Sequence, residues 1–391
     1  MATGAGTHDI GEQDTPARDA GSRPAGPGDV HARDAWARDR DAWARDVDEA
    51  VAVTVRELRA VADRDWSGPA AGLEWSCHET AVHMAGDFVG YAAQLTGRAT
   101  DTYVPLDVVA PPGTGPAGLV RVVEATGGLL SAAVRTTPAG VRAWHPCGAT
   151  GADGFAAMGV VEALVHTHDI VRAHGGTDRW APAELCARVL DRLFPHVPRS
   201  GDPWRTLLWA TGRAGLDGAP RPAVWRWYGE PVRSARLLLC EVSPNVGADL
   251  HDGGDGGFTW ADGGPPEGTR IAGRLVAEAH AAGAYRPGWG PYAIVRAADR
   301  RAVGAVGFHA APDADGLAEV GYDVVEGARG NGYATEALRA LAGWAFAHPA
   351  TTVLRAVVDH GNAPSHRVVA RAGFTRAREG EGAAVYELRR T

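Results

Sequence analysis

Lysine is absent from the 391 residues, so the strongly basic side chains are all arginines. Without a lysine amine the chain cannot form a lysine Schiff base with a carbonyl substrate. The sequence has four cysteines, and they are scattered without the CxxC spacing of a zinc site. They also do not form the dense framework of paired cysteines found in small secreted domains. Neither a zinc knuckle nor a disulfide framework is therefore expected.

Long basic runs and apolar runs of membrane length are also lacking. The net charge is −8 at pH 7, which favours neither nucleic acid nor an anionic membrane as a partner. The N-terminus has no charged segment followed by an apolar one, so the sequence predicts a soluble, cytoplasmic protein. The composition leaves the oligomeric state open, a dimer included. A chain of 391 residues is long enough for two domains with separate cores.

Residues 1–45 are rich in Gly, Pro, Asp, Arg and Ala and poor in aliphatic residues. The heptad RDAWARD occurs twice in succession, at Arg33–Asp39 and at Arg40–Asp46, and its second copy ends one residue beyond this segment. Such a segment cannot bury enough apolar surface to fold alone. The sequence predicts a disordered tail, with any helix near Trp36 and Trp43, and the repeat suggests no function.

Residues 46–233 are expected to form an all-α helical bundle, because four helical patterns follow one another with short connections. The first places Val47, Val51, Val55 and Leu58 on one face, and the second begins after Ser76 as N-cap and runs to about Leu95. The third and fourth cover Ala117–Val134 and Asp153–Ala173, and Gly175-Gly176 ends the fourth. A further helix is predicted over residues 181–194, and a mixed extension containing strands over Arg205–Tyr228.

The stretch expected as the fourth helix carries the first of two candidate sites. Glu162 and His166 are four residues apart, so their side chains project from one face of a helix. A carboxylate and an imidazole at this spacing can hold a divalent metal, and His83 on the second helix can supply a third ligand. Three protein ligands with an open position are the composition of a catalytic zinc site. The alternative is a solvated pair on a helix surface without a metal.

Longer motifs in this half resemble the mycothiol-dependent maleylpyruvate isomerase superfamily of DinB-like bundles. The matching segments are Trp75–Asp87, the Trp144-His145-Pro146 turn, Glu162-x-x-x-His166-Thr167-His168-Asp169 and Thr211-Gly212-Arg213. The resemblance covers about residues 46–230. It implies a divalent metal bound by His83, Glu162 and His166, and we expect this metal to be zinc. Asp169 is expected to contact one of these ligands from behind. The resemblance also implies a low-molecular-weight thiol such as mycothiol as a cosubstrate.

The region from Leu317 to Ala347 carries the second candidate site. An alternating run over Leu317–Val325 predicts a strand, and Ala334–Ala347 predicts a helix. The glycine-rich turn between them lets the backbone approach a ligand, and the helix start offers free N–H groups and a positive dipole end. The sequence therefore predicts an anion site, most simply for a pyrophosphate. The turn matches neither GxxxxGK[ST] nor the full GxGxxG fingerprint.

Arg-x-x-Gly-x-Ala at this turn instead resembles the coenzyme A pyrophosphate loop of the GNAT acetyltransferases. After a strand over Val353–Val358, Asn362-Ala363-Pro364-Ser365 opens a helix that ends in Ala372-Gly373-Phe374. That order resembles the ribosomal-protein-alanine (RimJ/RimL-like) branch of the family. The resemblance implies transfer of an acetyl group from acetyl-CoA to an amine within a ternary complex. The residues implied in coenzyme binding are Arg329, Gly330, Asn331, Gly332, Tyr333, Ala334 and Asn362.

The same resemblance implies two catalytic residues. Glu319 stands where relatives carry a glutamate that accepts the amine proton, directly or through water. Ser365 is expected to protonate the leaving thiolate. The strand that bears Glu319 is expected to separate from its neighbour, so that a freed backbone N–H polarises the thioester. Otherwise Glu319 is a surface carboxylate of a strand, and Asn362 caps its helix, a role compatible with coenzyme binding.

The remaining patterns are expected to complete an α/β GNAT domain over residues 235–391, with a mixed, centrally splayed sheet. The Gly-, Asp- and Pro-rich run over 243–268 is predicted to be a long loop on the acceptor side. The other expected elements are strands over Ala235–Val242, Pro291–Ala297, Ala302–His309 and Ala383–Leu388 and a helix over Thr269–Ala282.

Three functions fit this two-domain reading. The first is an N-acetyltransferase, acting on a small molecule or a protein N-terminus, fused to a metal-binding bundle. In the second, a thiol-dependent isomerase or transferase activity of the bundle is the main function. In the third, the bundle is a docking or dimerising module without catalysis. The sequence does not identify the acceptor amine.

Overall fold

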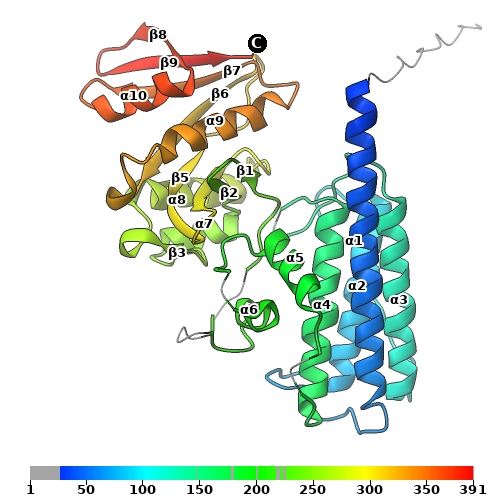
Figure 1. Ribbon diagram of the computed structural model, residues 1–391. Helices are drawn as coiled ribbons and strands as arrows, with labels where there is room; N and C mark the ends of the chain where they lie inside the picture. The colour runs from blue at the N-terminus through cyan, green and yellow to red at the C-terminus, as the bar shows by residue number, and fades with distance from the viewer. Residues whose placement is uncertain are drawn as a thin grey trace, which may run out of the picture.

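A computed structural model describes residues 27–390 except 147, 178–179, 200, 217–220 and 223–225, with side chains from residue 36 onward. Figure 1 shows two parts, a bundle of long helices in the N-terminal half and a mixed sheet with helices in the C-terminal half. This agrees with the predicted fold class.

Four long helices form the bundle: α1 (Pro27–Arg59), α2 (Cys77–Gly97), α3 (Pro116–Thr136) and α4 (Ala152–Ala173). Helices α1 and α2 each pack against both α3 and α4. The start of α2 follows from the sequence, since Ser76 and Glu79 form a capping box that satisfies two backbone N–H groups. Helix α4 is buried along nearly its whole length, so its polar side chains lie inside the bundle.

Helix α3 also has the length and composition of a membrane span, contrary to the expected absence of such a run. Among the described residues it alone passes that test, and half of its most apolar stretch is buried in the bundle. Burial against α1 and α2 accounts for its apolar face.

Helix α1 begins at Pro27, within the predicted disordered tail, and it includes Trp36 and Trp43, near which the prediction allowed a helix. Trp43, in the second copy of the heptad, is buried in the bundle core. The Arg188 guanidinium lies 4.7 Å above its ring and also pairs with Asp46 at 2.8 Å. The segment cannot fold alone, but packing against α5 (Ala183–Leu193) supplies partners that its composition does not reveal. Residues 1–26 lie outside the described part of the chain.

Helix α6 (Pro203–Ala210) occupies the start of the predicted strand-containing extension. Asp202 caps it by accepting a hydrogen bond from Trp204 N at 3.0 Å, and the buried Trp204, Leu207 and Leu208 fall at helical spacing. The described residues between 211 and 228 add no strand to the sheet. The strands expected there are therefore wrong for this part.

The C-terminal sheet has nine strands in the order β1-β2-β4-β5-β6-β7-β9-β8, with β3 beside β5. Pairing is antiparallel except between β6 and β7 and between β3 and β5. The strands are β1 (Val232–Arg233), β2 (Leu237–Glu241), β3 (Thr259–Trp260), β4 (Pro291–Arg296), β5 (Arg301–Phe308), β6 (Leu317–Val324), β7 (Val353–Asp359), β8 (Thr375–Glu379) and β9 (Ala383–Arg389).

Helices cover both faces of this sheet, and each face has its own core. On one face α9 (Tyr333–Phe346) and α10 (Ala363–Ala372) pack on alternate strand residues such as Leu237 and Leu239. On the other, α7 (Pro244–His251) and α8 (Glu267–Ala281) cover a core that contains Leu238 and Cys240. The alternation along β2 follows from the two-residue period of a strand.

The predicted loop over 243–268 is wrong in its first part, because α7 lies there, followed by β3 and a 3-10 turn (Ala261–Gly263). Pro244 at the first helical turn and the buried Val246 and Leu250, four apart, explain the helix. Strand β8 was not predicted, and all five of its residues are exposed. Short elements of this kind have too few apolar positions to show a period.

The register between β6 and β7 is the feature that positions the site. Their parallel pairing joins Leu317 to Val353, Ala318 to Leu354 and Glu319 to Arg355, and it stops there. Beyond Glu319, β6 continues to pair with β5 on its other side. The sheet is therefore splayed at its centre, as predicted.

Candidate functional sites

The loop between β6 and α9 presents backbone N–H groups toward solvent. Gly330 and Gly332 have φ of +79° and +78°, a left-handed conformation that favours glycine. Gly332 is the N-cap of α9, and no side chain there accepts a hydrogen bond from the first turn. Those N–H groups and the helix dipole are therefore available to an anion, as the predicted site requires.

A cavity of ≈ 450 Å³ lies beside this loop, between β6, α9 and α10. Of the predicted coenzyme residues it is lined by Arg329, Gly330, Gly332, Tyr333, Ala334 and Asn362, together with the predicted acid Ser365. The structure thus brings together two segments that are about thirty residues apart in sequence.

Asn331 and Asn362 both brace backbone in this region. The Asn331 amide donates to the carbonyls of Ala328 at 3.1 Å and Arg329 at 3.2 Å, so it holds the turn from within. Asn362 caps α10 by accepting a hydrogen bond from Ser365 N at 3.2 Å. The cap expected as an alternative for Asn362 is present, and its position on the cavity leaves both roles open to it.

Arg236 and Glu336, which sequence reasoning missed, fasten this loop to the start of the sheet. The Arg236 guanidinium donates to Asn331 O at 3.1 Å and to Glu336 Oε2 at 2.7 Å, and it lies over the Tyr333 ring. The other Glu336 oxygen accepts from Ser234 Oγ and Arg236 N, each at 2.8 Å. Arg236 and Glu336 are 100 residues apart in the sequence, so no local pattern could predict their pairing.

A second cavity, of ≈ 220 Å³, lies on the opposite side of β6 under α8. Its lining includes Ile271 and Leu275 of α8, Phe308 and His309 at the end of β5, and Gly321 of β6. Tyr322 and Asp323 line both cavities. The two spaces therefore meet along β6, just past the point where β6 leaves β7.

Asp323 anchors α8 to this strand. Its carboxylate accepts hydrogen bonds from Thr269 N at 2.7 Å, Thr269 Oγ1 at 2.8 Å and Ala305 N at 3.0 Å. Burial raises the pKa of Asp323, although these hydrogen bonds act in the opposite direction. With three donors already bound, Asp323 positions the wall of the second cavity.

Glu319, the predicted base, lies at the last residue pair that joins β6 to β7. Its side chain is 35% exposed, and its carboxylate is 3.1 Å from His309 Nδ1. His309 lines the second cavity, whereas Glu319 is not among the lining residues. His309 was not predicted, because a histidine at the end of a strand has no distinguishing spacing.

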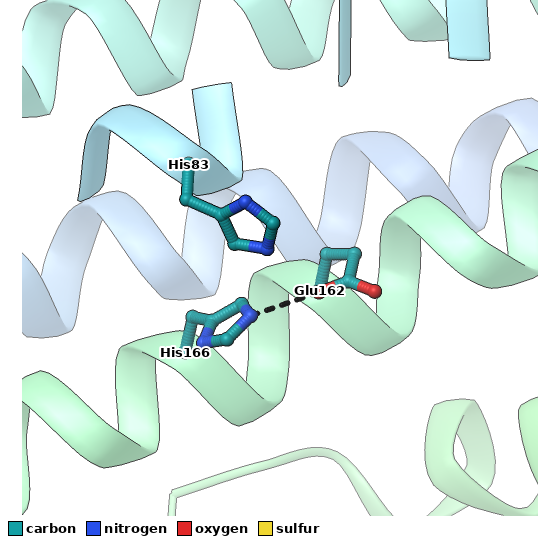
Figure 2. A group of neighbouring side chains, drawn as sticks. All are labelled: His83, Glu162 and His166. Atoms are coloured by element: carbon teal, nitrogen blue, oxygen red, sulfur yellow. Dashed lines mark ion pairs between the residues drawn. The ribbon is translucent and has the colours of Figure 1, made fainter. Parts of the chain in front are cut away.

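The three predicted metal ligands converge in the bundle, as Figure 2 shows, with His83 on α2 and Glu162 and His166 on α4. One ligand atom from each lies within 4.8 Å of the others. Glu162 and His166 are both buried, and His166 Nε2 is 3.0 Å from Glu162 Oε2. A cavity of ≈ 620 Å³ opens onto all three residues. The solvated surface pair is therefore ruled out as a description of Glu162 and His166.

Ionisation at this centre reflects burial and pairing. Burial would lower the pKa of His166, but pairing with the carboxylates of Asp169 and Glu162 outweighs it and raises the pKa to about 9. Burial would raise the pKa of Glu162, and its bond with His166 brings it below the usual range. Burial, then the neighbouring His166, lowers the pKa of His83. A metal would replace the proton shared by Glu162 and His166, since ligands bind metal in their deprotonated form.

Carboxylates stand behind both histidines. Asp169 Oδ2 lies 3.3 Å from His166 Nδ1, as expected from its place one turn further along α4. Asp87, which was not predicted as part of the site, has Oδ2 at 3.1 Å from His83 Nε2. Burial, with the nearby Glu162, raises the pKa of Asp87 to about 8. Two imidazoles and a buried carboxylate facing a cavity suit a divalent metal such as zinc, and the outer carboxylates orient the imidazoles.

Two separate parts of the chain match known families. Residues 256–375 match the family described as acetyltransferase (GNAT) domain, and residues 47–171 match the mycothiol maleylpyruvate isomerase N-terminal domain. Over 87 residues the chain is 30% identical to the uncharacterized N-acetyltransferase YjdG of Bacillus subtilis (strain 168), covering 22% of this chain and 52% of that protein. The chain thus spans about half the length of that curated relative.

Part of the chain is also similar to solved structures that are described as acetyltransferases. One is a putative ribosomal-protein-serine acetyltransferase from Vibrio cholerae, 19% identical, covering 41% of this chain and 97% of that one with a TM-score of 0.31. Another is a GNAT-family acetyltransferase from Bacillus anthracis, also 19% identical, covering 40% and 94% with a TM-score of 0.29.

Proposed function

Because the chain carries a GNAT acetyltransferase domain behind a mycothiol maleylpyruvate isomerase-like domain, we propose that it moves an acetyl group from acetyl-CoA to an amine. The observation that carries the proposal is the separation of β6 from β7 after Glu319, with one cavity on each side of β6. Coenzyme and acceptor can then approach a single strand from opposite sides. Holding both reactants in line removes the need for a covalent enzyme intermediate.

The chain's own residues divide the chemistry along β6. The loop at Gly330–Gly332 and the start of α9 hold the pyrophosphate of the coenzyme. A backbone N–H of β6 past Glu319 polarises the thioester carbonyl as negative charge develops on its oxygen. Ser365, which lines the coenzyme cavity, donates a proton to the leaving thiolate. Tyr322 holds the backbone of this residue, since its Oη donates to Ser365 O at 3.3 Å.

Glu319 is the carboxylate on the path by which the acceptor amine loses its proton. It lies at the cavity end of the paired segment of β6 and contacts His309, which lines the acceptor cavity. An amine that enters as ammonium must lose a proton before it can attack the thioester.

The acceptor cavity fits an amine on a small apolar group. Its lining is mostly aliphatic and aromatic, with Ile271 and Leu275 from α8 and Phe308 from β5. The one carboxylate in the lining, Asp323, already accepts three hydrogen bonds. A polycation would find no free carboxylate among the described lining residues. We therefore favour a compact apolar amine, whether a small molecule or the N-terminal residue of a protein.

In the bundle we propose that His83, Glu162 and His166 hold one divalent metal, most simply zinc. Such an ion, when bound, can lower the pKa of a coordinated water or thiol. Trp75 closes one side, its ring 4.6 Å from that of His83. A thiol-dependent isomerase or transferase activity, with mycothiol as an example of the thiol, is the second candidate function, favoured by the cavity beside these ligands. A docking module without catalysis is the third.

The test is the release of free coenzyme A from acetyl-CoA with a panel of amines. Leucinamide and phenethylamine represent compact apolar amines, and spermidine and kanamycin represent polycations. We expect turnover with the first pair and little with the second. If coenzyme A is released with none of these four amines and with no other primary amine of a wider panel, acetyl transfer is not the function. The cytoplasmic location and the oligomeric state stay predictions.

A further inference from the structure

We propose that His309 is the catalytic base that contacts the acceptor amine, and that Glu319 acts through it as a positioning residue. This inference rests on the proposed acetyl transfer and deepens it. It assigns a residue that the sequence did not single out, and it changes the direct or water-mediated role expected for Glu319.

The backbone places the two side chains on one face of the sheet. His309 follows β5, and its N–H donates to Glu319 O at 3.0 Å, so the two residues are cross-strand neighbours. Neighbours of this kind project to the same side. Their side chains meet there, with His309 Nδ1 3.1 Å from Glu319 Oε1. An ionised carboxylate only accepts hydrogen bonds, so in the neutral imidazole the proton belongs on Nδ1.

The other imidazole nitrogen is directed toward Gly321. A Cβ placed on Gly321 would lie 3.0 Å from His309 Nε2, so this nitrogen sits over the backbone of β6 where any side chain would obstruct it. Gly321 and His309 both line the acceptor cavity. Nε2 therefore carries its lone pair at the cavity, two residues beyond the point where β6 leaves β7.

The other titratable groups around the cavity are already engaged. Among the described lining residues these are Asp323 and Tyr322. Asp323 accepts three hydrogen bonds, and Tyr322 Oη donates to Ser365 O. Arg355, opposite Glu319 in the register with β7, pairs with Glu387 at 3.1 Å. The residues that α8 contributes to the lining carry no charge. His309 is thus the base with a free lone pair in this lining.

The proton balance follows from this geometry. The ammonium gives one proton to His309 Nε2, and the imidazolium is stabilised by Glu319 on Nδ1. The neutral amine then forms the C–N bond, the C–S bond breaks, and the second proton of the nitrogen ends on the thiolate. His309 is 58% exposed, so it returns the first proton to water. The sum is one amide, one thiol and one proton released.

The test measures coenzyme A release with leucinamide or phenethylamine, whichever the panel shows to be turned over. His309→Gln should lower kcat by on the order of 100-fold without weakening acetyl-CoA binding, and it should flatten the rise of the rate with pH. Added imidazole should restore part of the rate of His309→Ala, which a structural role would not allow. Glu319→Gln should lower kcat, and the double variant should be no slower than His309→Gln, because the two residues act as a unit.

The matched control is His360→Gln, since His360 is also an exposed histidine near a glutamate, Glu379, at 3.8 Å. It should leave the rate unchanged. A His309→Gln rate within threefold of wild type beside a slow Glu319→Gln would overturn the inference and return the base role to Glu319. Turnover of no amine by the wild-type protein would instead overturn the proposed function and the inference together.

Discussion

Arg213 donates to Asp169 through two nitrogens, directly behind His166, the proposed metal ligand. Its Nη2 lies 2.7 Å from Asp169 Oδ2 and its Nε 3.0 Å from Oδ1, while Oδ2 is 3.3 Å from His166 Nδ1. Burial alone would raise the pKa of Asp169, but bonds to His166, His168 and Arg213 hold it well below its usual range. Together with His166, the Arg213 guanidinium therefore keeps a fully buried carboxylate ionised beside the proposed metal site.

Replacement of Arg213 should weaken the bundle and its metal site together. Arg213→Leu leaves the buried Asp169 charge without its main partner, a loss that costs about 3–5 kcal/mol in comparable pairs. We expect a lower melting temperature in calorimetry and zinc binding about 10- to 100-fold weaker by titration. Arg205→Leu, at an exposed position on α6, is the control. Equal stability of the two variants would show that the pair does not support the site.

The proposed metal gives the second prediction. Protein purified without chelator should contain close to one divalent ion per chain, because Glu162 and His166 are buried together and face His83. His83→Ala and His166→Ala should release it and lower the melting temperature of the bundle, whereas His78→Ala on the same helix α2 should not. Acetyl-CoA binding should survive in all three variants. No bound ion and no thermal shift on adding zinc would favour the docking module.

Gly332→Val should abolish acetyl-CoA binding while the bundle stays folded. At φ +78° a β-branched residue is strained, and its side chain would enter the space that the pyrophosphate needs. Isothermal calorimetry measures the affinity. Gly343→Val on the same helix is the control, since nothing lies within 4 Å of a Cβ there. Unchanged affinity of Gly332→Val would place the coenzyme elsewhere.

Glu336→Gln should loosen the coenzyme loop from the sheet. The glutamine keeps the shape but loses the charge that binds Arg236, so Kd for acetyl-CoA should rise by on the order of tenfold. Glu278→Gln breaks a comparable pair, Arg274–Glu278 at 2.9 Å on α8, and should leave Kd unchanged. If Kd for acetyl-CoA rises equally in both variants, the effect is a general change in charge and does not come from the pair that holds the loop.

His196 should make the junction of the two parts acid-sensitive. Its ring lies 4.7 Å from Tyr228 and 5.6 Å from Phe258, and its Nδ1 has no hydrogen-bond partner. Burial, then the neighbouring Arg199 and Arg300, lowers the pKa of His196 from 6.5 to about 3. Stability from the neutral ring is complete above pH 6.5 and is lost as pH falls toward 3, because the unfolded chain takes up the proton first.

At pH 5 this loss amounts to about 2 kcal/mol. His196→Phe should therefore match wild type in urea unfolding at pH 7.5 and exceed it at pH 5. His251→Gln, an exposed histidine on α7, should follow wild type at both values. If His196→Phe loses as much stability as wild type between the two pH values, the acid sensitivity has another source.

Periodic stretches and glycine turns made most of the fold predictable. The helices α2 to α5 and the strands from β4 to β7 lie close to the predicted ranges, because each is long enough to show its period. Helix α7 and strand β8 were missed because short elements depend on tertiary partners. The start of α1 at Pro27 was not predicted, and the helix near Trp43 was only allowed, because Trp43 packs against Arg188, more than a hundred positions away.

The sites followed the same rule. Glu162 and His166 are related by helical spacing, and the coenzyme loop by its glycines, so sequence alone could propose them. His309, Arg236 and Glu336 contact residues that only the fold brings near, whereas Asp87 lies four residues from His83 on the same helix and its spacing was overlooked. Glu319 was proposed from resemblance, and the sequence could not show that His309 stands between it and the cavity.

The short pairing of β6 with β7 also affects how the domain is made. Strands β4, β5 and β6 are neighbours both in the chain and in the sheet, so they can pair without any later segment, whereas β7 is synthesised only after α9. During that interval β6 is an open edge, on which another nascent chain can pair. The carboxylates of Glu319 and Asp323 alternate with apolar residues on this strand and discourage such pairing. The edge of β6 that the proposed reaction needs open is thus also an edge that another chain can pair with before β7 is made.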